Sequence, residues 1–173
     1  MAGSLEFIKS AEITTTSTTL DVTDCFTSNY DVYQITFSGI STSTAVTENY
    51  AIRFLDTSDT QITANYAYAV LQMRASAVFE EKRSTSQSGL IYLVRAYSDP
   101  KGGSANLFVY NPTDTSSYTF SNWQSAGQVN TNLNANEKGI GVLKDTQEVT
   151  GIRLYGFGGL SMDSAKISVY GVK

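Results

Sequence analysis

The sequence predicts an all-β fold, an antiparallel sandwich or barrel built as one domain over residues 1–173. A length of 173 residues suits a single domain. The chain holds 21 Ser, 21 Thr and 12% aromatic residues, and Thr, Tyr and Phe fit the half-buried surface of a sheet. Short segments of alternating polarity are separated by turn residues throughout, a pattern typical of antiparallel all-β domains.

The first half of the chain supplies four expected strands, each justified by alternation. Tyr33, Ile35 and Phe37 share one face of their segment, because successive side chains of a strand point to opposite faces. The polar run 56–60 (Asp-Thr-Ser-Asp-Thr) predicts a turn at the end of the fourth strand. These strands are expected at residues 5–8, 18–23, 30–38 and 49–56.

The second half begins with the strongest strand, residues 90–96, which is apolar on both faces except at Arg95. Turns with proline are predicted at 99–103 and 111–114. The Asn-rich segment 127–136 is expected to be an exposed loop. The remaining strands are expected at residues 105–111, 118–120 leading into Trp123, 139–143, 151–155 and 165–172.

Residues 66–83 carry conflicting signals. Their Ala, Leu, Met and Glu content favours a helix, but Tyr66, Tyr68 and Val70 alternate with alanines as in a strand. We expect an irregular segment, a strand followed by a loop, with a short helix over one sheet end as the alternative.

The composition excludes several functions. With no histidine, the chain cannot build a Ser-His-Asp triad or a His-ligated metal site. Its net charge of −4 and scattered Lys and Arg lack the basic face that nucleic-acid binding requires. Apolar runs are too short to span a membrane, and residues 1–6 lack a signal peptide. We therefore expect synthesis in the cytoplasm, with no metal, cofactor, nucleic acid or membrane as partner.

Three stretches resemble a group of bacteriophage virion proteins. They are residues 26–37 (Phe-Thr-Ser-Asn-Tyr-Asp-Val-Tyr-Gln-Ile-Thr-Phe), residues 107–112 with 118–120 and 123–124, and residues 151–155 with the C-terminal 165–173. The group has jelly-roll-like β-sandwich domains and occurs in tails, fibres and capsid decorations, often of marine and cyanobacterial phages. The resemblance runs from about Phe7 to Lys173, and departs at 66–83, where the group usually has a Gly/Ser-rich loop.

The resemblance implies a jelly-roll-like sandwich located in the virion and without enzymatic activity. Because the chain lacks fibre repeats, we expect a capsid decoration or cement protein that docks on the assembled capsid. The implied partners are the major capsid protein or other virion proteins, and the implied assembly is a homotrimer. The alternatives are a tail-fibre or receptor-binding domain that recognises a host glycan, a tail or head-to-tail adaptor, and, least favoured, an enzyme.

Four residues are candidate partner contacts: Trp123, Phe157, Leu160 and Arg95. Trp123 could form an aromatic platform for a sugar on a loop, but burial in the core is the favoured interpretation. Phe157 and Leu160 lie in the Gly-rich segment 156–160, which predicts a connection with exposed apolar tips. Arg95 either faces solvent, which is favoured, or pairs with a carboxylate across an interface; the same holds for Arg53 and Arg153.

The acidic pairs are weaker candidates for chemistry. Two carboxylates across a cleft could hydrolyse a glycoside, but acids in Ser/Thr-rich turns more often cap the turn. The turn 56–60 could hold calcium, although it lacks the full spacing of a calcium loop. Cys25 has no partner cysteine and is expected to be a buried, unreactive thiol. The acidic pairs are Asp21 with Asp24, Asp56 with Asp59, and Glu80 with Glu81.

Overall fold

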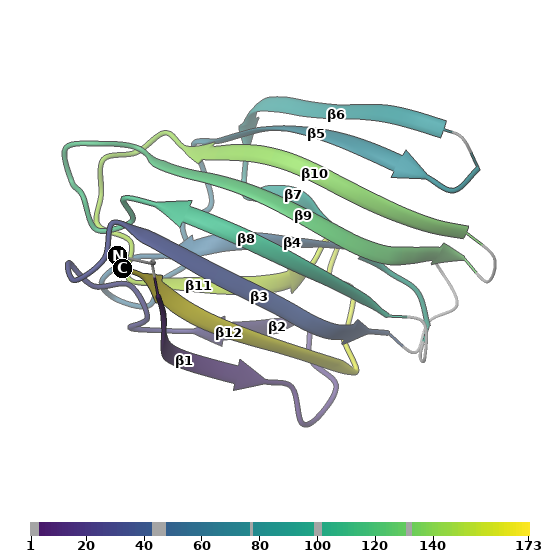
Figure 1. The fold of residues 1–173 in the computed structure, drawn as a ribbon, viewed down its shortest axis with the longest axis horizontal. Coiled ribbons are helices and arrows are strands. Elements are labelled where there is room, and N and C mark those ends of the chain that lie inside the picture. Colours follow the sequence, from purple (N-terminus) through teal and green to yellow (C-terminus); the bar gives the residue numbers. More distant parts are fainter. Residues whose placement is uncertain (1–3, 43–47, 77, 99–101, 131–132) are drawn as a thin grey trace.

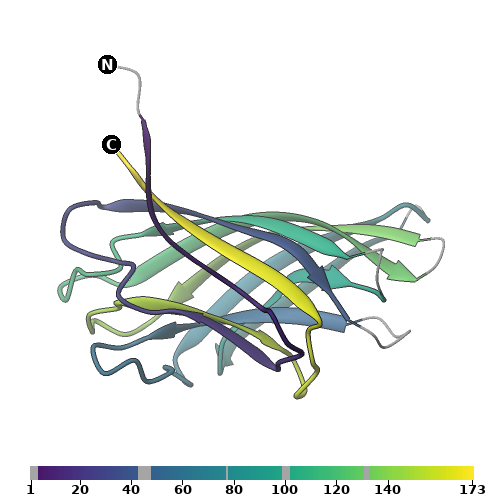
Figure 2. The same cartoon turned by 90° about the horizontal axis from the view of Figure 1, so that it is seen from below.

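The computed structural model describes residues 4–42, 48–76, 78–98, 102–130 and 133–173, and folds them into two facing antiparallel sheets (Figures 1 and 2). The larger sheet has eight strands in the order β1 (Leu5–Glu12), β12 (Ser164–Val172), β3 (Val32–Ser41), β8 (Gly103–Tyr110), β9 (Thr119–Asn130), β10 (Leu133–Leu143), β5 (Tyr66–Arg74) and β6 (Val78–Gln87). The smaller sheet has the order β2 (Thr19–Val22), β11 (Gly151–Gly156), β4 (Glu48–Leu55) and β7 (Leu90–Ala96).

The strand order is that of a jelly roll with two inserted hairpins. Without β5–β6 and β9–β10, eight strands remain. Each lies in the opposite sheet from the strand before it, except that the fourth and fifth, β4 and β7, both lie in the smaller sheet. Their orders are then first-eighth-third-sixth in one sheet and second-seventh-fourth-fifth in the other. This is the double Greek key of a jelly roll, so the predicted fold class is confirmed.

The two hairpins widen one sheet only. Strand β9 pairs with β8, β10 with β9, and β5 with β10, so that the hairpins continue the larger sheet as far as its edge strand β6. Strand β7 of the smaller sheet packs across from β9, β10 and β5. The smaller sheet therefore covers the inner face of β9, β10 and β5. Most of the surface that the hairpins add to the molecule is the outer face of the larger sheet.

The core lies between the sheets and follows from the alternation of each strand. Tyr33, Ile35 and Phe37 of β3 are buried, as expected, and so are Leu107 and Val109 of β8. Each such side chain stabilises the fold by about 1.5–3 kcal/mol through removal of apolar surface from water. Facing them from the smaller sheet are Ile52, Phe54, Ile152 and Leu154.

The segment 66–83 was expected to be a strand followed by a loop. The strand is confirmed as β5, but the expected loop is wrong, because residues 78–83 form part of β6, and the described residues of the segment contain no helix. The alternation of Tyr66, Tyr68 and Val70 decides the structure, because all three are buried on the inner face of β5. The helix-favouring Ala and Leu residues between them occupy the outer face. Burial of one face thus outweighs the helix propensity of the segment.

The expected loop at 127–136 is also wrong where the structure describes it, since residues up to Asn130 belong to β9 and those from Leu133 to β10. Their pairing with each other and with β5 supplies the backbone hydrogen bonds that the Asn-rich composition did not predict. Of the turn predicted at 99–103, residues 99–101 lie outside the described ranges.

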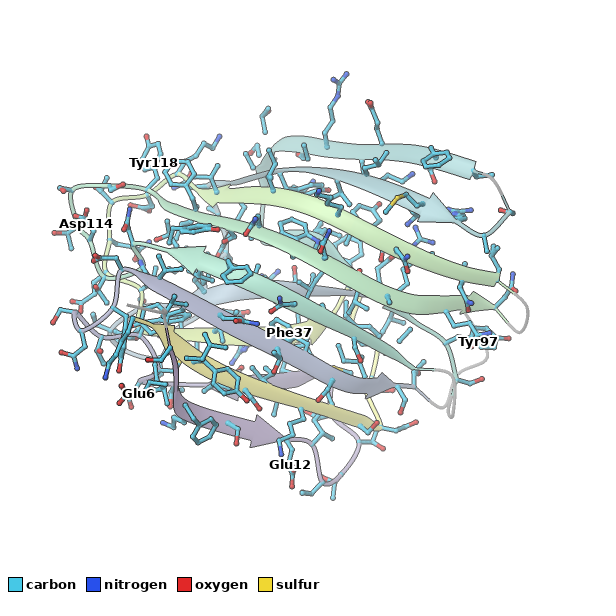
Figure 3. All side chains as sticks on the ribbon, in the orientation of Figure 1. Glu6, Glu12, Phe37, Tyr97, Asp114 and Tyr118 are labelled. Carbon is cyan, nitrogen blue, oxygen red and sulfur yellow. The ribbon has the colours of Figure 1, made fainter. Side chains whose placement is uncertain are left out.

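The turn after β8 is confirmed at one end of the sandwich. Asn111 has a positive φ of 53°, and the amide of Asp114 donates to its carbonyl at 3.3 Å. Asp114 and Tyr118 lie at this end, opposite Tyr97 (Figure 3). The two chain ends run side by side, with Lys173 donating its amide to Ser4 at 3.1 Å (Figure 2).

Candidate binding face of the eight-stranded sheet

The outer face of the larger sheet, defined as the side turned away from β7 and its neighbours, carries an unusual row of apolar side chains. Register places these residues next to one another across β3, β8, β9, β10 and β5. Because paired residues of antiparallel strands point to the same side, they form one continuous strip. We call it the apolar row: Val32, Tyr110, Phe120, Val142 and Ala67.

Further apolar side chains are exposed elsewhere on the outer face, and of these Ile140 lies two residues from Val142 of the row. Phe79 is 71% exposed, Ile140 64% and Phe7 58%. The open face of an antiparallel sheet normally alternates to polar residues. Large apolar side chains gathered on one exposed surface instead mark interaction sites.

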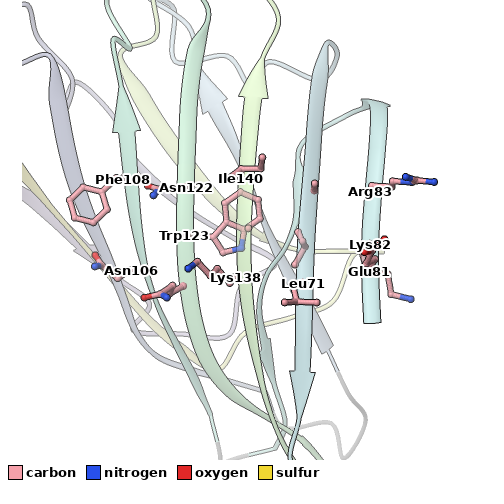
Figure 4. A pocket seen from close by; sticks show the side chains of 14 residues that line it. Leu71, Glu81, Lys82, Arg83, Asn106, Phe108, Asn122, Trp123, Lys138 and Ile140 are labelled. Carbon is pink, nitrogen blue, oxygen red and sulfur yellow. The ribbon is translucent and has the colours of Figure 1, made fainter. Parts of the chain in front are cut away.

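A hollow of about 660 Å³ lies beside the apolar row, over β8, β9, β10, β5 and β6 (Figure 4). We call it the amide groove, because three carboxamide side chains line it together with an aromatic ring and two cations. The alanine Ala69 on β5 is flanked by Ile140 and Arg83 in the register, and its small side chain leaves space between them. The residues used below are Asn106, Phe108, Asn122, Gln124, Lys138 and Arg83.

A second hollow of about 650 Å³ adjoins the amide groove and shares Ala69, Arg83 and Ile140 with it. It is lined by Phe120 and Val142 of the apolar row. The polar hollow and the apolar hollow thus meet at Ile140. This residue is the most exposed of the large apolar side chains on β10.

The outer side of the smaller sheet, in contrast, has its charges satisfied internally. Arg153 donates to both carboxylate oxygens of Asp21, at 2.7 and 2.6 Å. Arg53 donates to Ser88 and Gln61 and lies over a tyrosine ring at 4.3 Å. Both arginines lie on the outer side of the sheet, as expected, but each is half-buried because its guanidinium is bound within the chain.

Trp123 is a core residue, which confirms the favoured interpretation. Its side chain is 2% exposed, and its Nε1 donates to the carbonyl of Tyr92 at 3.1 Å. It lies in the middle of β9 and not on a loop, on the face turned toward β7. The prediction that the ring of Trp123 contacts a partner is therefore wrong.

Arg95 is buried, with 8% exposure, and the expectation that it faces solvent is wrong. Its Nε lies 3.3 Å from Oε1 of Glu137. Burial lowers the pKa of Arg95 and raises that of Glu137, because each charge has lost water. Arg95 thus pairs with a carboxylate of its own chain.

Glu137 lies at the centre of a buried polar network. Gln72 and Ser125 donate to its two carboxylate oxygens, each at 2.8 Å. Arg74 donates in turn to Gln72 at 2.8 Å and to Glu80 at 3.0 Å. The network joins β5, β6, β9 and β10 on the inner face, and its donors and acceptors are directed at one another, as expected for a structural cluster.

Phe157 and Leu160 lie in the turn between β11 and β12. Phe157 is exposed, and Leu160 is half-buried. Gly158 and Gly159 have φ of +83° and +85°, a conformation that side chains disfavour, which explains the glycines of this segment. Phe157 therefore stays a predicted contact, separate from the outer face.

The acidic pairs serve the fold. Oδ1 of Asp56 accepts from the amides of Ser58 and Thr60 at 2.8 and 3.0 Å, so it caps its turn. Glu80 pairs with Arg74 and Lys82, on the opposite side of β6 from Glu81. The described residues bring together no group of three or more Cys, Asp or Glu side chains suited to a metal ion.

Cys25 is fully buried, and its Sγ donates to the carbonyl of Val22 at 3.3 Å. Burial raises the pKa of the thiol to about 12. In the described part of the chain, no helix could span a bilayer.

Sequence reasoning missed the residues of the amide groove. The signal was present in residues 107–110 (Leu-Phe-Val-Tyr), which are apolar on both faces of a strand that has only one buried face. Leu107 and Val109 point inward, so Phe108 and Tyr110 must lie outside. Their grouping with Asn122 and Lys138 depends on register, which one strand alone does not reveal.

Comparisons with known proteins leave the family open. No protein-family model matches the chain, and no curated protein sequence matches it significantly. Among solved structures, a chain in "Structure of infectious bursal disease virus Gt strain" aligns with 6% identity and a TM-score of 0.15. The alignment covers 98% of this chain and 38% of that chain. A TM-score this low carries no argument about fold or function.

Proposed function

We propose that this protein is a non-enzymatic structural protein of a bacteriophage virion, a decoration or cement protein that docks on the assembled capsid through the outer face of its eight-stranded sheet. The observation that carries the proposal is the apolar row with the exposed side chains Phe7 and Ile140 near it on the same face. No described element covers this surface.

The dimensions of the face support docking. Eight strands spaced by about 4.8 Å make a surface about 34 Å wide. Stable protein interfaces bury roughly 800 Å² on each partner, with apolar and aromatic residues enriched at their centre. The outer face offers such a centre in Phe120 and Ile140, while the smaller sheet presents charges already paired within the chain.

The fold and the sequence agree with a virion role. Jelly rolls occur in viral capsid proteins and in lectins, and the three stretches described above resemble phage virion proteins. A domain that binds only the assembled lattice would stabilise that lattice by mass action. We propose a homotrimer as the docking form and the major capsid protein as the partner.

Sedimentation of the purified protein with capsids that lack it tests this proposal. We expect saturable co-sedimentation that Phe120→Ser and Ile140→Ser each weaken at least tenfold, since both remove apolar area from the docking surface. Phe157→Ser is the matched control, because it removes an exposed ring elsewhere. Loss of binding in Phe157→Ser alone would place the contact at the β11–β12 turn, and no binding by the unchanged protein would overturn the proposal.

A further inference from the structure

We infer that the amide groove is a binding site for an acidic saccharide chain. This site goes beyond the capsid-docking proposal and does not depend on it. The groove lies on the polar side of the outer face, whereas docking is assigned to the apolar row; Ile140 borders both, so the tests of the groove use other residues. An experiment can therefore disprove the docking proposal or the groove inference without disproving the other.

The carboxamides supply the hydrogen-bonding groups. Asn106 pairs with Gln124, and Phe108 with Asn122, in neighbouring positions of β8 and β9. An amide side chain both donates and accepts, and so does each hydroxyl of a sugar. The carboxamides of the groove can therefore donate hydrogen bonds to the hydroxyls of a saccharide chain and also accept hydrogen bonds from them.

Two of the amides are already oriented by the protein. Oδ1 of Asn106 accepts from Nε2 of Gln34 at 3.1 Å, and Oδ1 of Asn122 accepts from the hydroxyl of Tyr110 at 3.1 Å. These bonds hold both carboxamides in place and, in this arrangement, leave the Nδ2 donors for a ligand. Side chains held in place before binding lose less conformational entropy on binding.

Apolar side chains line the groove between the polar ones. Phe108 is half-buried beside Asn122, and Ile140 and Leu71 flank the hollow from β10 and β5. The carbon-bound hydrogens of a sugar ring pack against an aromatic face or a branched side chain, while its hydroxyls bond at the ring edge. The groove lining thus alternates between apolar and polar groups, as the surface of a sugar does.

Charge selects an acidic chain. The whole protein has 16 acidic and 12 basic residues, but the groove lining has two cations on the outer face, Arg83 and Lys138, against the single carboxylate of Glu81. Among the described residues, Arg83 and Lys138 form no salt bridge, so they remain available for ligand carboxylates.

The size and charge of the groove favour a short oligosaccharide over a nucleic acid. The register Asn106–Gln124–Lys138–Leu71–Glu81 crosses five strands, a span of about 19 Å at 4.8 Å per step. Nucleic-acid binding proteins typically neutralise several phosphates along a basic face. Two unpaired cations suit instead the occasional carboxylates of an acidic saccharide.

Isothermal titration with three probes tests the inference: a hexamer of uronic acid, the neutral cellohexaose, and a single-stranded DNA 12-mer. We expect the uronate hexamer to bind at least tenfold more tightly than cellohexaose. Asn122→Ala and Gln124→Ala should weaken it at least tenfold, and Lys138→Gln should remove most of the preference for the acidic probe. Asn134→Ala is the matched control, since Asn134 is an exposed amide on β10 outside the groove.

Each result that would contradict the inference can be told apart from the others. Absence of uronate binding, equal affinity for cellohexaose, or binding unchanged in the Asn122 and Gln124 variants would overturn the inference. Tighter binding of the DNA would overturn it in favour of a nucleic acid. Emission of the single tryptophan verifies that each variant is folded, and capsid sedimentation of Lys138→Gln, expected to be normal, separates this site from the docking surface.

Discussion

Arg95 of β7 and Glu137 of β10 form an ion pair inside the sandwich, with 3.3 Å between Nε and Oε1. The pair connects the smaller sheet to the hairpin β9–β10 that widens the larger one. The ion pair therefore holds in place the part of the larger sheet whose outer face carries the amide groove.

Removing the cation should destabilise the fold strongly. We expect Arg95→Met to lower the free energy of unfolding by about 3–5 kcal/mol at pH 8, because a buried carboxylate loses its counter-charge. Urea denaturation followed by tryptophan emission measures the effect. Arg153→Met, at a half-exposed ion pair, is the comparison and should cost about 1 kcal/mol or less. Equal costs for both variants would contradict the structural role of the buried pair.

The stability should depend on pH through Glu137. Burial raises the pKa of this carboxyl above its ordinary value of 4.5, despite hydrogen bonds from Ser125 and Gln72 and the charges of Arg95 and Arg74. Between 4.5 and the raised pKa, the folded chain binds more protons than the unfolded chain, so its stability falls as the pH rises.

Glu137→Gln should remove this contribution. The difference in unfolding free energy, variant minus native protein, should therefore become more positive from pH 4 to pH 8 in urea titrations. A difference that is constant, or that moves the other way, would show that the neighbouring cations outweigh the burial of the carboxyl.

Glycine at position 139 is required by the buried tryptophan. A Cβ built there lies 2.2 Å from Cζ2 of Trp123, so Gly139→Ala should displace the indole and cost about 1–3 kcal/mol. Thermal unfolding and the emission maximum of Trp123 measure this. Gly158→Ala is the control: its Cβ meets nothing within 4 Å, so only the cost of its positive φ remains, about 1 kcal/mol, with unchanged emission. A normal emission spectrum in Gly139→Ala would contradict the packing.

Cys25 should not react in the folded protein. Its thiol is fully buried with a pKa of about 12, and the thiolate is the reactive form. At pH 8, labelling by a disulfide reagent should proceed only as fast as the protein opens, and should accelerate in urea along the unfolding curve. Rapid stoichiometric labelling of the native protein would show that the segment after β2 is open.

Much of the fold was predictable from local patterns. The alternation of Tyr33, Ile35 and Phe37 correctly assigned the buried face of β3, and residues 90–96, apolar except at Arg95, correctly predicted the buried strand β7. The jelly-roll class was implied by the resemblance, and the strand order shows this fold class independently. These features depend on periodicity within a few residues, which a sequence displays directly.

The errors have a common cause in long-range pairing. Residues 66–83 and 127–136 lack strong strand propensity, and they become strands because β5 pairs with β10. The contacts of Arg95 were unpredictable for the same reason, since its partner Glu137 lies on β10, directly after the misassigned segment 127–136. The candidate site depends on register across five strands, and therefore none of its six residues could be grouped from the sequence.

The number of copies of this protein per virion tests the central claim most directly. Quantitative mass spectrometry against the major capsid protein would measure it in purified particles. A capsid decoration that docks through the outer face should be present in hundreds of copies. Between three and a few tens of copies would indicate a tail, fibre or vertex protein instead, and its absence from particles would contradict the virion role altogether.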